Sequence, residues 1–162
     1  MQRIIGGKGY TSQVDFTRPA NTTAYTAGDV VGSAAAAISL TDIGHEFGHI
    51  IITDADLRID VTSIPSGMTT FRLHLYSVTP PSALADNAAW DLPAGDRSAY
   101  LGYIDFDTPV DFGSTLFVSM TGINKKLKMG STAGLFGYLV TNAGWTPSSA
   151  TVKSIRLNSV GV

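Results

Sequence analysis

A two-residue alternation of side chains is the feature that most constrains what this chain can fold into. Over residues 51–61 the even positions are mostly charged, whereas the odd positions are apolar or small. Because successive side chains of a β-strand point to opposite faces of a sheet, this pattern indicates a half-buried strand, and residues 70–78 repeat it. The residues predicted to face inward are Ile51, Thr53, Ala55, Leu57, Ile59 and Val61, then Phe71, Leu73 and Leu75, with Arg72, His74 and Tyr76 facing outward.

Short strand-like segments separated by turn residues recur along the whole chain. We predict further strands over residues 10–16, 29–32, 36–40, 100–106, 115–120, 135–141 and 151–157, with loops rich in proline, glycine and asparagine between them. Only residues 81–90 are expected to form a helical turn or two. This organisation is typical of an all-β fold, and we predict a single-domain antiparallel β-sandwich, jelly-roll-like, with eight to nine strands. We expect the sandwich domain to span residues 13–162 and an extended N-terminal arm to span residues 1–12.

Composition restricts the classes of function. A chain of 162 residues can bury roughly 70% of its unfolded surface, so it needs no disulfide or metal to fold. It has no cysteine. Its net charge of −2 argues against nucleic-acid binding, which needs a clustered excess of Lys and Arg. The one basic cluster is Lys125, Lys126 and Lys128. No apolar run approaches the ~20 residues that a membrane helix requires. Only 15% of the residues are charged, compared with about 25% in ordinary domains, so we expect a partner to cover part of the surface.

One segment matches the zinc-protease pattern H-E-x-x-H, namely His45-Glu46-Phe47-Gly48-His49. On a helix the two histidines would share one face and could bind one zinc ion, with the glutamate as general base. A helix is not expected here, because Gly44 and Gly48 disfavour it and a β-branched run follows at once. In an extended chain the two histidines would lie about 13 Å apart. His74 is the only other histidine and Glu46 the only glutamate, so we predict no metal, no cofactor and no catalytic residue.

Two weaker alternatives stay open. Aspartates recur at Asp54, Asp56 and Asp60 and again at Asp105, Asp107 and Asp111, but neither group has the ligand number that calcium prefers. Trp90 and Trp145 are the only tryptophans, and exposed aromatic rings would suit a glycan-binding module.

The segment Phe16-Thr17-Arg18-Pro19-Ala20-Asn21-Thr22-Thr23-Ala24-Tyr25-Thr26-Ala27-Gly28-Asp29-Val30-Val31-Gly32 resembles a family of small structural proteins of tailed bacteriophages. The resemblance continues over residues 71–76, 85–90, 135–140, 145–147 and 155–157, and so covers most of residues 14–157. It implies a jelly-roll cement or decoration protein that binds the major capsid protein on the outside of the head, without catalysis. The chain departs from the family at His45, Glu46 and His49, where a loop rich in glycine and serine is expected.

We therefore expect a non-enzymatic, homo-oligomeric virion protein, a dimer or trimer, made in the host cytoplasm and binding neither nucleic acid nor membrane. The alternatives are a glycan-binding module or head-fibre base on the same fold and, more distantly, a zinc peptidase. The residues predicted to contact the capsid or another subunit are Ile4, Ile5, Tyr10, Trp90 and Trp145.

Overall fold

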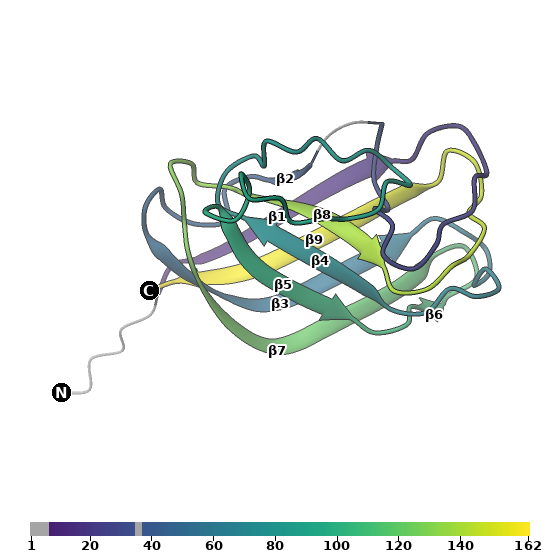
Figure 1. Cartoon of the computed structure of the whole chain (residues 1–162). Helices are drawn as coiled ribbons and strands as arrows, with labels where there is room; N and C mark the ends of the chain where they lie inside the picture. Colours follow the sequence, from purple (N-terminus) through teal and green to yellow (C-terminus); the bar gives the residue numbers. More distant parts are fainter. Residues whose placement is uncertain (1–6, 35–36) are drawn as a thin grey trace.

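The computed structural model describes residues 7–34 and 37–162, and within these ranges all regular secondary structure is β-strand (Figure 1). The strands are β1 (Gly9–Thr17), β2 (Ile38–Leu40), β3 (His49–Ile59), β4 (Phe71–Tyr76), β5 (Tyr100–Phe106), β6 (Val110–Asp111), β7 (Leu116–Lys128), β8 (Leu135–Thr141) and β9 (Val152–Gly161). Two predicted strands, residues 100–106 and 135–141, coincide with β5 and β8. The strand predicted over residues 29–32 is wrong, because Asp29 and Val30 form only isolated bridges, to Ala89 and Val140.

The strands form two antiparallel sheets that pack face to face. One sheet has the order β1-β9-β3-β7-β6, and the other has the order β2-β8-β4-β5. All the pairings within both sheets are antiparallel. The predicted all-β, antiparallel sandwich is thus confirmed.

The order of pairing identifies the sandwich as a jelly roll. Leaving aside the two-residue β6, the chain pairs as one long rolled hairpin, in which β4 meets β5, β3 meets β7, β2 meets β8 and β1 meets β9. Rolling this hairpin brings β9 beside β3 and β8 beside β4, which are the remaining pairings. Eight strands wound in this way define the double-sheet jelly roll.

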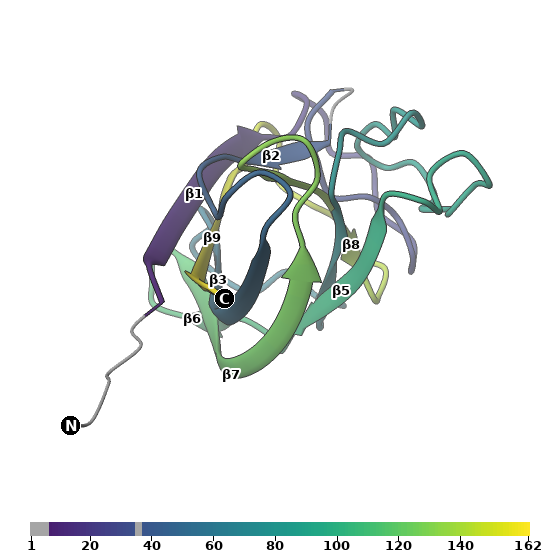
Figure 2. The same ribbon diagram turned by 90° about the vertical axis from the view of Figure 1, so that its left-hand side faces the viewer.

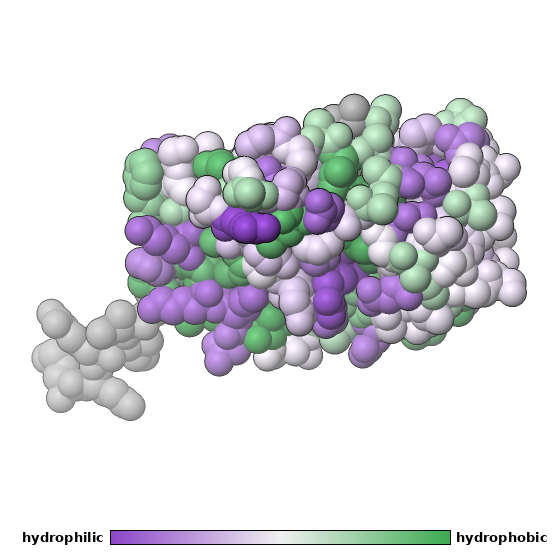
Figure 3. All heavy atoms as spheres, in the orientation of Figure 1, coloured by the Kyte–Doolittle hydropathy of each residue, from purple (hydrophilic) through white to green (hydrophobic). Residues whose placement is uncertain are grey.

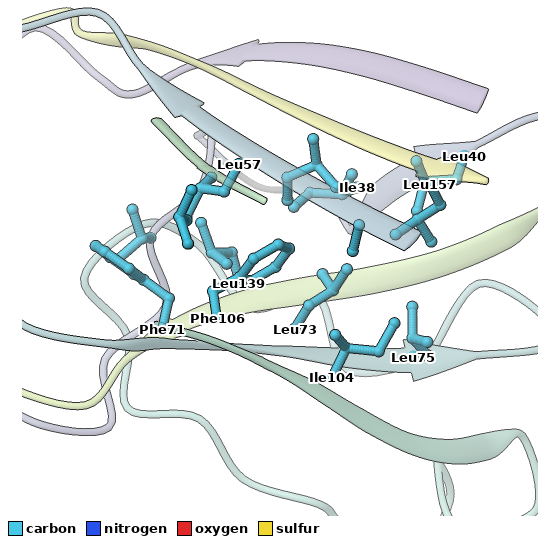
Figure 4. Packing of buried hydrophobic residues seen from close by; sticks show 14 of the residues in the cluster. Ile38, Leu40, Leu57, Phe71, Leu73, Leu75, Ile104, Phe106, Leu139 and Leu157 are labelled. Atoms are coloured by element: carbon cyan, nitrogen blue, oxygen red, sulfur yellow. The ribbon is translucent and has the colours of Figure 1, made fainter. Parts of the chain in front are cut away.

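Apolar side chains from the two sheets meet between them and form the main core. In Figure 4, Leu57 and Leu157 of one sheet point toward Leu73, Leu139 and their neighbours of the other. All four are 0% exposed. Burying one such side chain contributes about 1.5–3 kcal/mol, so this layer is what holds the sheets together.

A β-bulge in β3 changes which residues of this strand face the core. The register shifts between Ile52 and Asp54 relative to both neighbouring strands. Ile50 and Ile52 are therefore buried before the bulge, and Ala55, Leu57 and Ile59 after it. The prediction that Ile51 and Thr53 face inward is wrong, because the extra residue reverses the alternation at this point.

The long connection between β4 and β5 covers the outer face of the four-stranded sheet (Figure 2). Its Leu84 and Trp90 pack on a second apolar cluster that includes Tyr76 and Tyr138 of this sheet. The helical turn predicted over residues 81–90 is wrong, because this segment follows irregular turns instead.

The boundary predicted for the N-terminal arm also needs correction. β1 begins at Gly9, which pairs with Val160, so residues 9–12 belong to the sheet. Residues 1–6, which make up most of the remaining arm, lie outside the described residues.

Candidate functional site

The zinc-protease pattern lies on a β-turn and a strand, as predicted, and not on a helix. The amide of Gly48 donates to the carbonyl of His45 at 3.1 Å, and Phe47 has a φ of 56°. β3 then begins at His49. Since the helical geometry that places both imidazoles on one face is not formed, the protease mechanism lacks its framework.

The turn nevertheless places His45 and His49 at one surface cavity. His45 and His49 line a surface cavity of about 270 Å³ together with Lys8 and Tyr10. The rings of Tyr10 and His45 meet edge to face with centroids 5.6 Å apart, and the Lys8 ammonium lies 5.2 Å from the Tyr10 ring centroid. Cationic and hydrogen-bonding groups thus gather here. The described residues contain no group of three or more His, Cys, Asp or Glu side chains that could hold a metal ion.

The segment that carries the family resemblance is anchored by a buried ionic network. The guanidinium of Arg18 donates to Asp86 at 3.1 Å and to the phenol oxygen of Tyr25 at 3.1 Å. The Tyr25 hydroxyl in turn donates to the other carboxylate oxygen of Asp86 at 2.6 Å, and the amide of Gly32 donates to that same oxygen at 3.0 Å. The side chains of Arg18 and Asp86 are 0% and 3% exposed. Two segments that carry the resemblance, residues 16–32 and 85–90, are therefore joined through one carboxylate.

Burial of this network shifts the titration of its members. Desolvation raises the pKa of Tyr25, and the hydrogen bond to Asp86 raises it further. Tyr25 therefore stays neutral and acts as a fixed donor to the carboxylate. A satisfied buried network of this kind makes the segments that it joins more rigid.

A second buried cation, Lys153, points inward from β9 near this network. It is 1% exposed, and its ammonium has no hydrogen-bond partner among the described residues. Burial lowers the pKa of Lys153 to about 8, with Asp86 acting in the opposite direction and Arg18 in the same one. Burying this ammonium without a partner destabilises the folded state.

Asp29 has a local role in the same segment. Its carboxylate accepts hydrogen bonds from the amide and the hydroxyl of Thr26 at 2.6 and 3.0 Å. Gly28 between them has a φ of 93°, which suits a residue without a side chain. The Asp29 carboxylate thus closes the turn over residues 26–29.

The two tryptophans do not form an exposed platform. Trp145 is 5% exposed and belongs to the main core, where its ring lies 4.9 Å from that of Tyr25. Trp90 is half-buried and stacks on His74, with ring centroids 3.6 Å apart. The prediction that Trp145 contacts a partner is therefore wrong, because its ring fills the interior.

His74 does face away from the main core, as predicted, but it is not exposed to solvent. It is 4% exposed beneath Trp90, and its Nδ1 lies 2.9 Å from the hydroxyl of Tyr100. Burial, assisted by the nearby positive charge of Arg72, lowers the pKa of His74 to about 4. The imidazole is therefore neutral at pH 7.

Three of the six aspartates considered for calcium have other partners. Asp56 pairs with Arg156 across the strands, and Asp105 pairs with Arg72 at 2.7 Å. Asp111 accepts a hydrogen bond from the amide of Gly113 at 2.7 Å. These partners occupy carboxylate oxygens that a calcium ion would need.

The remaining residues of the predicted interface differ in their location. Ile4 and Ile5 lie outside the described residues. Tyr10 is half-buried at the start of β1, and its hydroxyl has no hydrogen-bond partner among the described residues. Sequence reasoning missed the most exposed large apolar residues, which are Phe112 at 68%, Phe47 at 66%, Val162 at 63% and Val110 at 56%.

The comparisons with known proteins give structural likeness at low identity. No family model matches the chain, and no curated protein matches it. The capsid of Ralstonia phage GP4 is 12% identical, over 99% of this chain and 88% of that one, with a TM-score of 0.45. The Cyanophage Pam1 capsid asymmetric unit is 14% identical over 99% and 89% of the two chains, with a TM-score of 0.38. The acid-stable capsid of Helicobacter pylori bacteriophage KHP30 is 12% identical over 96% and 90%, with a TM-score of 0.33.

At these TM-scores the likeness carries no weight of its own, so the jelly-roll assignment rests on the strand order of the chain itself. Within the described ranges, no helix is long and apolar enough to cross a membrane.

Proposed function

We propose that this chain is a non-catalytic structural protein of a bacteriophage virion, which binds the outer surface of the capsid and stabilises it. In this role it is a cement or decoration protein, its partner is the major capsid protein, and it acts as a homo-oligomer.

One observation carries this proposal. Residues 16–32 and 85–90 resemble phage structural proteins in sequence, and Arg18 and Asp86 from these two segments form one buried ion pair in a jelly roll. Residues that carry the resemblance thus have a shared structural reason to occur together. The jelly roll that the resemblance implies is also the strand order that the chain adopts.

The fold suits a role in binding other proteins. Two packed sheets form a rigid body whose loops and strand edges remain available for contacts. A capsid repeats one binding site many times, and linking several copies of a small protein raises the effective concentration of each one at its site. A modest contact per copy is then sufficient.

The N-terminal arm is part of this proposal. Its two isoleucines, Ile4 and Ile5, would add apolar contacts to a neighbouring subunit or to the capsid. Deleting residues 1–6, which precede β1, should lower capsid occupancy and leave the sandwich folded. Undiminished occupancy would remove the arm from the proposal.

The decisive experiment uses heads of the phage that encodes the chain, assembled without it. Adding the purified protein should give saturable binding in co-sedimentation, with one set of sites per capsid lattice. Bound protein should be accessible to antibodies on intact heads, and the heads should resist heat or chelators better than undecorated heads. Binding that never saturates, or heads that gain no resistance, would contradict the proposal.

A further inference from the structure

The loop before β7 carries a small acidic and apolar surface. This acidic tip, residues 107–112, contains the exposed carboxylates of Asp107 and Asp111 and no basic residue. Val110 and Phe112 between and beside them are 56% and 68% exposed. An exposed apolar surface rimmed by polar residues is a form that protein contact sites take, so we consider the tip as one half of a contact.

The opposite end of the same sheet is basic. Three exposed lysines, Lys8, Lys126 and Lys128, lie there, whereas Lys125 is half-buried and points toward β5 of the other sheet. The strand register places Lys126 beside Ile51, Ile51 beside Val160, and Val160 beside Gly9. These residues form a row across four strands, with Lys126 at one edge and Lys8, which precedes Gly9, next to the other. We call this end of the sheet, with Lys8, Lys126 and Lys128, the basic end.

The basic end has its own apolar residue and a hollow. Phe47, at the tip of the turn before β3, is 66% exposed. Beside it lies the cavity of about 270 Å³ lined by Lys8, His45 and His49, with no Asp or Glu side chain in its lining. Asp42 and Glu46 of the β2–β3 connection also lie at this end, and its three exposed lysines outnumber these two acidic side chains. Figure 3 shows hydrophilic residues gathered near the end where β9 finishes.

The two surfaces cannot meet within one molecule. Asp111 pairs with Leu116 at the start of β7, whereas Lys126 and Lys128 lie at the end of this strand. Ten residues of strand separate Leu116 from Lys126, which corresponds to about 33 Å. Figure 1 shows β6 and the C-terminus at opposite ends of the sandwich.

We infer that the acidic tip of one copy docks on the basic end of a second copy, in a head-to-tail contact. Both halves of the contact are present on this chain, with opposite charges and with an exposed phenylalanine on each side. A contact between two different surfaces is heterologous, so it generates a closed ring when the rotation closes. This inference deepens the proposed function, since it names the surfaces that build the homo-oligomer.

The first test is sedimentation velocity of the purified full-length protein at about 100 µM, in about 50 mM and about 500 mM salt, because salt screens exposed charges. The wild-type protein should associate at low salt and less at high salt. Reversing the basic end with K126E/K128E, or the tip with D107K/D111K, should weaken association at least about tenfold. Combining all four substitutions should restore it, because the opposite charges then face each other again.

The absence of cysteine allows a direct test of which surfaces touch. Mixing D111C protein with K126C protein under mild oxidation should give a disulfide-linked heterodimer in preference to either homodimer. A double variant with both cysteines, D111C/K126C, cannot form the bond within one molecule. A disulfide needs Cα atoms closer than about 7 Å, and the two positions lie at opposite ends of the sheet. The matched control pairs D111C with S119C, which lies near the start of β7, away from the basic end, and should not cross-link.

Three results would overturn the inference: a wild-type monomer at low salt, unchanged association of K126E/K128E, or a quadruple variant that fails to associate although its circular dichroism shows it folded. Phe112→Ser provides an uncharged check and should also weaken association. Capsid co-sedimentation of the same variants keeps the two proposals distinguishable. Head-to-tail contacts that fail while single copies still saturate capsids would leave the proposed function intact.

Discussion

The imidazole of His74 stacks on the indole of Trp90, with ring centroids 3.6 Å apart and planes inclined by 14°. His74 belongs to β4, and Trp90 belongs to the connection that crosses this strand. The Trp90 Nε1 also donates to the hydroxyl of Tyr76 at 3.3 Å. One stacked pair therefore fixes a long irregular segment to the sheet beneath it.

This contact predicts a loss of stability in mild acid. The pKa of His74 is lowered to about 4, from an ordinary value near 6.5. Between pH 6.5 and 4 the unfolded chain therefore binds a proton that the folded chain does not, so the free energy of unfolding falls as the pH falls. We expect a fall of about 1–2 kcal/mol from this group, measured by urea denaturation across the window. His74→Phe keeps the stacking and should flatten this dependence, whereas the exposed His49→Phe should not.

The buried Lys153 predicts the opposite behaviour in alkali. Its pKa is lowered to about 8, so between pH 8 and 10.5 the unfolded chain holds a proton that the folded chain has lost. Stability from this group should therefore rise as the pH increases through that window. Lys153→Met should remove the rise and stabilise the protein at pH 7 by about 2–3 kcal/mol, seen as a higher melting temperature. Lys128→Met on the surface should change stability by less than about 0.5 kcal/mol.

The Arg18–Asp86 pair predicts a large cost for removing one partner. Asp86→Ala leaves the guanidinium of Arg18 buried without its carboxylate and should destabilise the protein by about 3–5 kcal/mol in denaturant titration. The Arg72–Asp105 pair is a matched control, since its side chains are 35% and 53% exposed. Asp105→Ala should cost less than about 1 kcal/mol. Equal costs for the two variants would contradict the buried network.

The zinc-protease pattern predicts a negative result in a metal assay. Because His45 and Gly48 close a β-turn instead of a helical turn, a strong chelator should leave the melting temperature of the purified protein unchanged. A shift of several degrees, reversed by zinc, would show that the two histidines bind a metal in a way that the geometry does not suggest.

Local patterns predicted the strands well where side-chain alternation alone decides them. The bounds of β5 and β8 follow from period two and flanking turn residues. The same rule failed at Ile51 and Thr53, because a bulge changes the phase of a strand without leaving a composition signal. The predicted helix at residues 81–90 failed for another reason, since docking of Leu84 and Trp90 on Tyr76 and Tyr138 overrides the helix propensity of the alanines in this segment.

The candidate site depended on contacts between residues far apart in the chain. The pattern around Arg18 and Tyr25 was visible in sequence, but Asp86, 68 residues after Arg18, gave no sign that it was their partner. Trp145 was predicted to be an interface residue, because the sequence does not show that its ring is buried by contacts with strands of both sheets. Exposed residues such as Phe112 were missed, since a single phenylalanine in a loop carries no periodicity to interpret.

The position of β9 between β1 and β3 links the order of synthesis to the moment of folding. β9 follows the other eight described strands in the chain and fills the middle of the larger sheet, so β1 has no strand to pair with until translation has passed Val152. A chain truncated before β9 would lack the strand that joins β1 to β3, and the two halves of the larger sheet would stay apart.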